Sequence, residues 1–196
     1  MNRQKEMTPG QLRILQAVAR LLENPANKIT VQRIAQEIHV TDGAIYRHYK
    51  SKDDIFDAIA SYMETNLLGP LNTAHQKEEQ IGRRLAYVFE QHLTFVEGHP
   101  GLARLMVGGG STEAMPLAER IKLLNGKLRA QVAQMFKLAE AQDKLLGGMS
   151  AELAAELFYG LVTGASVAHA FGLPQVGGAA KWGVLERSCL KPESSA

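Results

Sequence analysis

Residues 29–56 read ITVQRIAQEIHVTDGAIYRHYKSKDDIF, and this segment predicts two short amphipathic helices joined by a tight turn. Thr30 can cap the first helix, and the second begins after Thr41. In the second helix Ile45 is expected to point inward and Tyr46 outward, with basic residues close behind. A compact helical hairpin with basic, aromatic and hydroxyl groups on its exposed side is suited to a phosphate backbone. The segment therefore predicts DNA binding through a helix-turn-helix.

The turn of this hairpin carries further support for its geometry. Ala35 is expected where the two helices cross closely, because a bulky side chain would clash there. Val40 and Ile45 can fill the small core between the helices. His39 occupies the turn position at which such motifs usually have glycine, since the backbone there tends towards positive φ. We therefore expect His39 to adopt a left-handed backbone conformation.

The positive charge of the hairpin is local. The chain of 196 residues carries a formal net charge of +2, whereas residues 28–52 hold five cations and two anions, a net of +3. A hydrophobic content of 45% with 21% charged residues is ordinary for a globular protein, and the length suits one large or two small domains. Judged by charge alone, this segment could equally be a solvated surface. The DNA-binding hypothesis therefore depends on the helix-turn-helix pattern and not on the charge.

Helical spacing continues on both sides of the hairpin. Thr8-Pro9 predicts the start of a helix that Asn24-Pro25 ends, and Ser51-Lys52-Asp53-Asp54 resembles a capping box that opens a long helix. Beyond Pro70, further helices are predicted near 77–97, 100–107, 116–143, 151–171 and 179–190. The sequence predicts an all-α protein with a three-helix, helix-turn-helix DNA-binding domain at 1–54 and a helical bundle at 55–196.

Several classes of protein are disfavoured by the sequence. The single cysteine, Cys189, suits a reducing cytoplasm, and the apolar stretch at 153–173 is too weakly hydrophobic for a membrane span. The six histidines show no paired metal spacing, and Gly108-Gly109-Gly110-Ser111 lacks the lysine of a phosphate-binding loop. We therefore expect a cytoplasmic protein that is not an enzyme, with no catalytic residues, metal or cofactor.

Three segments carry a resemblance to a known family: Thr30 to Ala35, Thr41 to Tyr49, and Ser51 to Phe56. With these segments, residues 8–60 resemble the TetR family of bacterial transcriptional regulators. The resemblance implies a homodimeric, nucleoid-associated DNA-binding regulator whose C-terminal bundle binds ligand and dimerises. It also implies a repressor that a small-molecule effector, of unknown identity, releases from a palindromic operator.

The resemblance and the hairpin geometry together give a set of candidate DNA-binding residues. Short side chains at 41–44 are expected nearest the base edges, whereas positions 32 and 33 can reach a base or a phosphate. Tyr46, His48 and Lys52 match positions that grip phosphates in the family; the alternatives are packing, a helix cap and a solvated cation, respectively. The full set is Thr30, Gln32, Arg33, Thr41, Asp42, Gly43, Ala44, Tyr46, Arg47, His48 and Lys52.

Small residues recur every four positions in the predicted helix at 151–171. Gly160, Gly164 and Ala168 clear one face, so another helix can approach closely. The family resemblance implies that this face belongs to a homodimer interface; packing within one chain is the alternative.

The resemblance also places a ligand pocket among the middle helices. The candidates are apolar or aromatic residues at helical spacing, a pattern that an ordinary core shares. They are Met63, Phe89, His92, Phe95, Met106, Phe136, Phe158 and Tyr159.

A narrower resemblance involves the nucleoid-occlusion regulators of the SlmA type. Residues 56–59, residues 99–106 and Trp182 are similar to those regulators, whereas Gly69-Pro70 interrupts the region where a charged helical surface would be expected. This resemblance implies a DNA-binding dimer that acts on the cell-division protein FtsZ. It stands as the alternative function.

Overall fold

The computed structural model describes residues 7–108 and 115–192, and within these ranges the protein is almost entirely helical. The helices are α1 (Pro9–Leu22), α2 (Val31–Glu37), α3 (Asp42–Tyr46), α4 (Lys52–Lys77), α5 (Ile81–Gly98), α6 (Pro100–Met106), α7 (Met115–Ala141), α8 (Ala151–Phe171) and α9 (Gly178–Cys189). An isolated antiparallel bridge between Leu145 and Leu190, which the sequence did not predict, joins the segments after α7 and α9. The predicted all-α class is confirmed.

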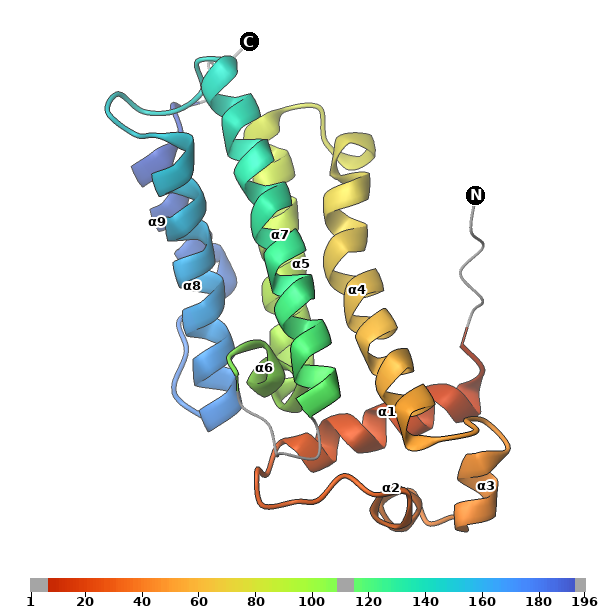
Figure 1. Ribbon diagram of the computed structural model, residues 1–196. Helices are drawn as coiled ribbons and strands as arrows, with labels where there is room; N and C mark the ends of the chain where they lie inside the picture. Colours follow the sequence, from red (N-terminus) through yellow and green to blue (C-terminus); the bar gives the residue numbers. More distant parts are fainter. Residues whose placement is uncertain (1–6, 109–114, 193–196) are drawn as a thin grey trace.

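The helices form two parts: a reading head made of α1, α2 and α3, and an upright bundle made of α4 to α9 (Figure 1). Helix α1 lies across the base of the bundle, with α2 and α3 below it, and α4 rises from this base alongside α5 and α7. Helices α8 and α9 stand at the opposite side of the bundle from α4. The predicted domain boundary at 54/55 falls in the first turn of α4, so one continuous helix joins the two parts.

Polar caps fix where several helices begin. The Thr8 and Ser51 hydroxyls accept from the backbone N–H groups of Gln11 and Asp54, whose side chains accept in return, so both helices start with capping boxes. The Thr30 hydroxyl accepts from Arg33 N, and the Ser150 hydroxyl accepts from Leu153 N. The predicted starts of α1, α2 and α4 are therefore confirmed.

Helix α4 continues through Pro70, and the predicted start of the helix that follows it was four residues too early. The sequence placed a helix at 77–97, whereas α4 ends at Lys77 and α5 begins at Ile81. Proline removes one backbone donor from the helix, but Leu67 and Leu68 before it and Ala74 after it are buried in the bundle. Tertiary packing on both sides of the proline thus outweighs the lost hydrogen bond.

The short helix α6 connects the reading head to the bundle. Gly101 is buried against α1, and a Cβ at this position would overlap the carbonyl oxygen of Ala19. On the other side of α6, Arg104 donates a hydrogen bond to the Ala170 carbonyl of α8 and lies 4.8 Å from the Phe171 ring. Before α6, His99 Nε2 accepts a 3.0 Å hydrogen bond from Tyr62 of α4, because His99 Nδ1 donates to the Phe95 carbonyl. Helix α6 therefore contacts the reading head and the bundle at the same time.

Candidate nucleic-acid interface

The hairpin of α2 and α3 has the geometry that its sequence predicts. Its turn brings the Val40 N–H to 2.9 Å from the Ala35 carbonyl, and His39 has a φ of 56°. Ala35 and Ile45 are each 1% exposed, so the small core between the helices is closed. The expected positive φ at His39 and the inward positions of Ala35 and Ile45 are confirmed.

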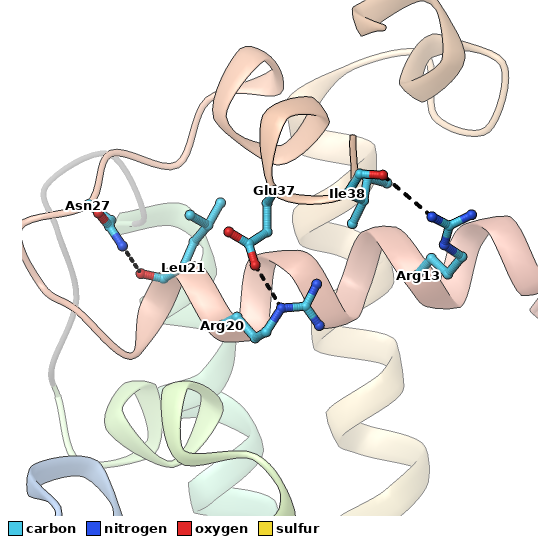
Figure 2. Close-up of polar contacts among 6 residues, drawn as sticks. All are labelled: Arg13, Arg20, Leu21, Asn27, Glu37 and Ile38. Carbon is cyan, nitrogen blue, oxygen red and sulfur yellow. Dashed lines mark hydrogen bonds and ion pairs between the residues drawn. The ribbon is translucent and has the colours of Figure 1, made fainter. Parts of the chain in front are cut away.

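Helix α1 fixes α2 through contacts that sequence reasoning missed (Figure 2). Arg20 Nε donates to Glu37 at 2.8 Å, and Arg13 donates to the Ile38 carbonyl at 3.4 Å. Both arginines are exposed, so the ion pair contributes about 0–1 kcal/mol of stability at most. The buried residues of α1 and α2 determine how the two helices pack, and these surface contacts add to that packing.

The outer face of the hairpin presents short side chains at one end of α3 and long ones at the other. Thr41 and Gly43 are exposed near the start of α3, and Asp42 and Ala44 are half-buried. Tyr46 is 52% exposed, and Arg47 after it is exposed as well. The expected outward direction of Tyr46 is confirmed, whereas its contact with phosphate stays a prediction.

The candidates around the start of α2 differ in their freedom to reach DNA. Gln32 is exposed on the first turn. The Arg33 guanidinium is exposed but donates to Asn27 Oδ1 at 3.0 Å, so a DNA contact would compete with this bond. The Thr30 hydroxyl is engaged as the helix cap, which leaves its second lone pair for a partner.

Two of the predicted phosphate contacts also have partners within the chain. The ring of His48 lies against Gly10 of α1, where a Cβ would come within 2.5 Å of the imidazole. The Lys52 ammonium lies 5.2 Å from the centre of the Phe56 ring one turn further along α4, a cation–π distance. Gly10 therefore makes room for His48, and Phe56 supports Lys52 at the edge of the hairpin.

Tyr49 belongs to the core of the reading head and not to its surface. It is 7% exposed, as the sequence predicted from its inward spacing. Burial raises the pKa of its phenol to about 12, because the phenolate would lose its hydration. Tyr49 stays neutral at any physiological pH and anchors the end of the hairpin.

The small-residue positions of α8 lie on an open, apolar face of the chain. Apart from the adjacent residues and the nearby backbone of α8 itself, no described atom lies within 4 Å of a Cβ built at Gly160 or Gly164, and Ala168 is half-buried on the same helix. Leu153, Leu157 and Phe171 of α8 are 45%, 40% and 60% exposed, and Val184 of α9 is 56% exposed. We call these seven residues the α8 face. The described helices of the same chain do not occupy the space at the two glycines, which disfavours the intramolecular alternative.

Most of the candidate pocket residues form a packed aromatic core. The Phe158 ring lies 5.1 Å from Phe89, 6.2 Å from Phe136 and 5.6 Å from Tyr159. Met63 and Phe95 are also buried, whereas Met106 is half-buried at the end of α6. A separate open hollow of about 320 Å³ between α4 and α7 is lined by other residues: Leu71, Ala130, Gln131, Gln134 and Met135. Periodicity gave no signal for that hollow.

His92 is a fully buried histidine within this core. Its Nδ1 donates a 2.8 Å hydrogen bond to the Val88 carbonyl, one turn earlier in α5. Nε2 is then an acceptor, and it has no hydrogen-bond partner among the described residues. Burial lowers the pKa of His92 from 6.5 to about 4, since the imidazolium would be desolvated. His92 is therefore a neutral core residue near pH 7.

Neither a metal site nor a membrane-spanning helix is found among the described residues. Within residues 7–108 and 115–192 there is no group of three or more His, Cys, Asp or Glu side chains that could hold a metal ion. None of the described helices is long and apolar enough to cross a membrane. The glycine-rich run extends through Gly109, Gly110 and Ser111, which lie outside the described residues.

Comparisons with known proteins agree with this geometry. Residues 14–59 match the family profile described as bacterial regulatory proteins, tetR family. The chain is 33% identical over 135 residues to the nucleoid occlusion factor SlmA of Shewanella amazonensis, an alignment that covers 68% of each chain.

Solved structures with low sequence identity share the fold. The ketosteroid transcriptional regulator KstR2 of Mycobacterium tuberculosis superposes with a TM-score of 0.75 at 15% identity, covering 95% of this chain and 98% of that one. The regulator FadR from Bacillus subtilis, solved in complex with stearoyl-CoA, gives 0.67 at 18% identity, covering 89% and 95%. With the helix-turn-helix, the family profile and the relative at 33% identity in agreement, the chain belongs to the TetR family of bacterial regulatory proteins.

Proposed function

We propose that the protein is a homodimeric, DNA-binding transcriptional regulator. The observation that carries this proposal is the outer face of α3, on which Thr41, Gly43, Tyr46 and Arg47 are exposed. Lys50 and Lys52 follow it closely in the chain. The buried core of the hairpin sets the orientation of this face, and the contacts of Arg13 and Arg20 with the end of α2 add to it. A rigid, locally basic helical hairpin supplies both the phosphate contacts and the base-edge contacts of a DNA reader. In the cell such a protein acts in the cytoplasm, at the nucleoid.

The α8 face supports the dimer. It joins apolar side chains at Leu153, Leu157 and Phe171 to the small residues Gly160 and Gly164, so a second helix could pack closely along it. A second copy of the chain presents the same face, and a two-fold interface pairs such a face with itself. A dimer would also double the number of base pairs read, because one short α3 gives little specificity alone.

A small-molecule effector completes the proposed mechanism. Helix α4 runs without a break from Lys52 beside the hairpin to Lys77 at the far end of the bundle. A ligand that opened the aromatic core around Phe158 would shift α4 and α6, and with them the spacing of the two reading heads. Operator DNA fixes the half-site spacing, so such a shift would release a repressor. FadR from Bacillus subtilis, which shares the fold, was solved in complex with stearoyl-CoA, and that ligand belongs to FadR.

Genome-wide mapping of the DNA sites bound by the intact protein tests this function. One or a few palindromic sites at promoters, including the promoter of its own gene, are expected for a local regulator. The absence of any enriched site would contradict the proposal.

A second candidate function is nucleoid occlusion, and the similarity to SlmA at 33% identity is the observation that favours it. In this case the protein would bind DNA and a cell-division protein, with no need of an effector. The same mapping separates the two functions. Many sites across the chromosome that are sparse near the replication terminus would support nucleoid occlusion and contradict a local regulator.

A further inference from the structure

The open hollow between α4 and α7 shares no lining residue with the aromatic core around Phe158. Its volume of about 320 Å³ lies at the lower end of the range for small-molecule sites. The lining residues are Leu71 of α4 and, from α7, Ala130, Gln131, Gln134 and Met135. A ligand could therefore enter this hollow without opening the packed core.

The surface between α4 and α7 follows a repeat of seven residues. The two helices rise from the base side by side and in the same direction (Figure 1). Two exposed ion pairs join them, one repeat apart: Asp57 to Arg120 at 2.5 Å and Glu64 to Lys127 at 2.8 Å. A third step of seven leads to Leu71 and Gln134, which form no ion pair and line the hollow. The hollow thus opens where the row of ion pairs stops.

The lining combines apolar surface with two uncommitted amides and carries no charge. Gln131 is half-buried and Gln134 exposed, and neither side chain hydrogen-bonds to another described residue. Residues three apart lie on one helix face, and each amide offers both a donor and an acceptor. A carboxylate only accepts and an ammonium only donates, whereas an amide group of a ligand does both. Since Lys127, one turn earlier, is already paired with Glu64, the hollow favours an uncharged amide.

Helix α4 is weakened directly beside the hollow. Gly69 and Pro70 precede Leu71, and both residue types are disfavoured inside a helix. Proline lacks the N–H that would bond to the carbonyl four residues earlier. Packing does not require the glycine, because its φ is not positive and a Cβ there would lie more than 4 Å from every neighbouring helix described. The backbone of α4 is therefore easiest to bend next to the lining residue Leu71.

We propose that this hollow binds an uncharged small molecule with an apolar body and an amide group, and that binding changes DNA affinity through α4. The body lies against Leu71 and Met135, and the amide pairs with Gln131 and Gln134. Contact with Leu71 selects one arrangement of α4 at the adjoining glycine and proline, and α4 leads from there to the hairpin. The binding site stands on the geometry of the hollow, whereas its effect rests on the proposed DNA-binding function.

Octanamide is the probe, because octanoate and octylammonium carry a charged head group on a similar chain. The full-length protein is labelled at its methionine methyl groups and observed by NMR, since Met135 lines the hollow and Met63 lies in the core. Octanamide should shift the Met135 signal with a dissociation constant of about 1 mM, the scale for so small a ligand. The charged analogues should bind about tenfold more weakly.

A variant that extends the row of ion pairs tests the position of the site. Leu71→Glu with Gln134→Lys places opposite charges at the third step and should abolish octanamide binding. The matched control, Asp57→Lys with Arg120→Glu, reverses an existing pair of the same row and should leave binding unchanged. Circular dichroism verifies that both variants fold. Ala130→Phe, which fills the hollow from an exposed position, serves if the first variant does not.

The effect on DNA is measured on a site that the wild-type protein selects from a random pool of duplexes. Saturating octanamide should change the affinity for this site by about fivefold or more. Gly69→Ala with Pro70→Ala strengthens α4 beside the hollow. This variant should bind octanamide as the wild type does, but its DNA affinity should respond less.

Four results would overturn the proposal. An unshifted Met135 signal would remove the site, and a shift of Met63 in its place would move the ligand to the core. Equal affinity for octanoate would remove amide recognition. Binding at Met135 without a change in DNA affinity would remove the effect on the reading head. If the wild-type protein selects no DNA site, the proposed function fails, whereas the octanamide titration still decides whether the hollow is a binding site.

Discussion

At the scale of single residues, Thr30 and Thr41 both precede helices, but only the Thr30 side chain caps its helix. The Thr30 hydroxyl accepts from Arg33 N at 3.2 Å, whereas that of Thr41 accepts no cap bond. Thr30→Val should therefore lower the free energy of unfolding by about 1 kcal/mol, and Thr41→Val should change it by less than about 0.5 kcal/mol. Urea denaturation of both variants measures the difference. Equal losses would contradict the assignment of the caps.

Tyr46 and Lys52 are predicted to contact phosphates, which makes their contribution dependent on salt. Tyr46→Ala and Lys52→Ala should weaken binding to all DNA sequences. Loss of the Lys52 charge should reduce the slope of log affinity against log salt by about one, because one fewer counterion is released. Lys137 of α7 is an exposed cation far from the hairpin, and Lys137→Ala is the matched control. An unchanged slope for Lys52→Ala would remove that residue from the interface.

The burial of His92 predicts a dependence of stability on pH. Its pKa is about 4 in the folded chain and near 6.5 when exposed, so the unfolded chain binds the proton more readily. Stability from this residue is complete above pH 6.5 and is lost as the pH falls towards 4. Between pH 7 and 5, the wild-type protein should lose about 2 kcal/mol more than His92→Leu. Denaturant unfolding at both pH values measures this; parallel losses would contradict a neutral, buried His92.

At the scale of elements, the hairpin could be predicted from the sequence because its determinants are local. Thr30, Ala35 and His39 lie within ten residues of one another, and the structure places each as expected. The contacts that fix the hairpin on α1 are not local. Arg20 and Glu37 are 17 positions apart, and Arg13 and Ile38 are 25 apart. Helical periodicity marks the arginines as exposed but does not name their partners.

In the long helices too, local sequence patterns do not predict features that depend on contacts between helices. Sequence spacing located the ends of α6 to α9 within two residues, but it placed the start of α5 four residues too early, near 77 instead of at Ile81. What carries α4 past the proline is packing against neighbouring helices, because Leu67 and Leu68 before Pro70 and Ala74 after it are buried. Exposed ion pairs to α7 join Asp57 to Arg120 at 2.5 Å and Glu64 to Lys127 at 2.8 Å. The hollow beside Leu71 likewise depends on how α4 and α7 meet. Pairings between elements decide such features, and single-element patterns do not contain them.

At the scale of the whole molecule, the α8 face predicts how the protein assembles. Leu157 of this face is 40% exposed, so a charged residue can be tolerated in the monomer but not between two packed copies. Leu157→Glu should convert the proposed dimer to a folded monomer and weaken binding to a palindromic site. Sedimentation velocity and circular dichroism measure the two effects. Leu123→Glu, on α7 at 70% exposure, should leave the dimer intact. A dimer that survives Leu157→Glu would place the interface elsewhere.

The crossing of α1 and α6 at Gly101 restricts which reading heads this bundle could accept in a chimera. The two helices meet backbone to backbone, so the joint depends on the absence of a side chain and not on a matching pair of side chains. A reading head exchanged from another regulator would have to present an equally bare stretch of α1 around Ala19. Recombination between relatives would then preserve function only where the exchange point keeps α1 and α6 from the same parent. The absence of a side chain at Gly101 thus requires that α1 and α6 be inherited together.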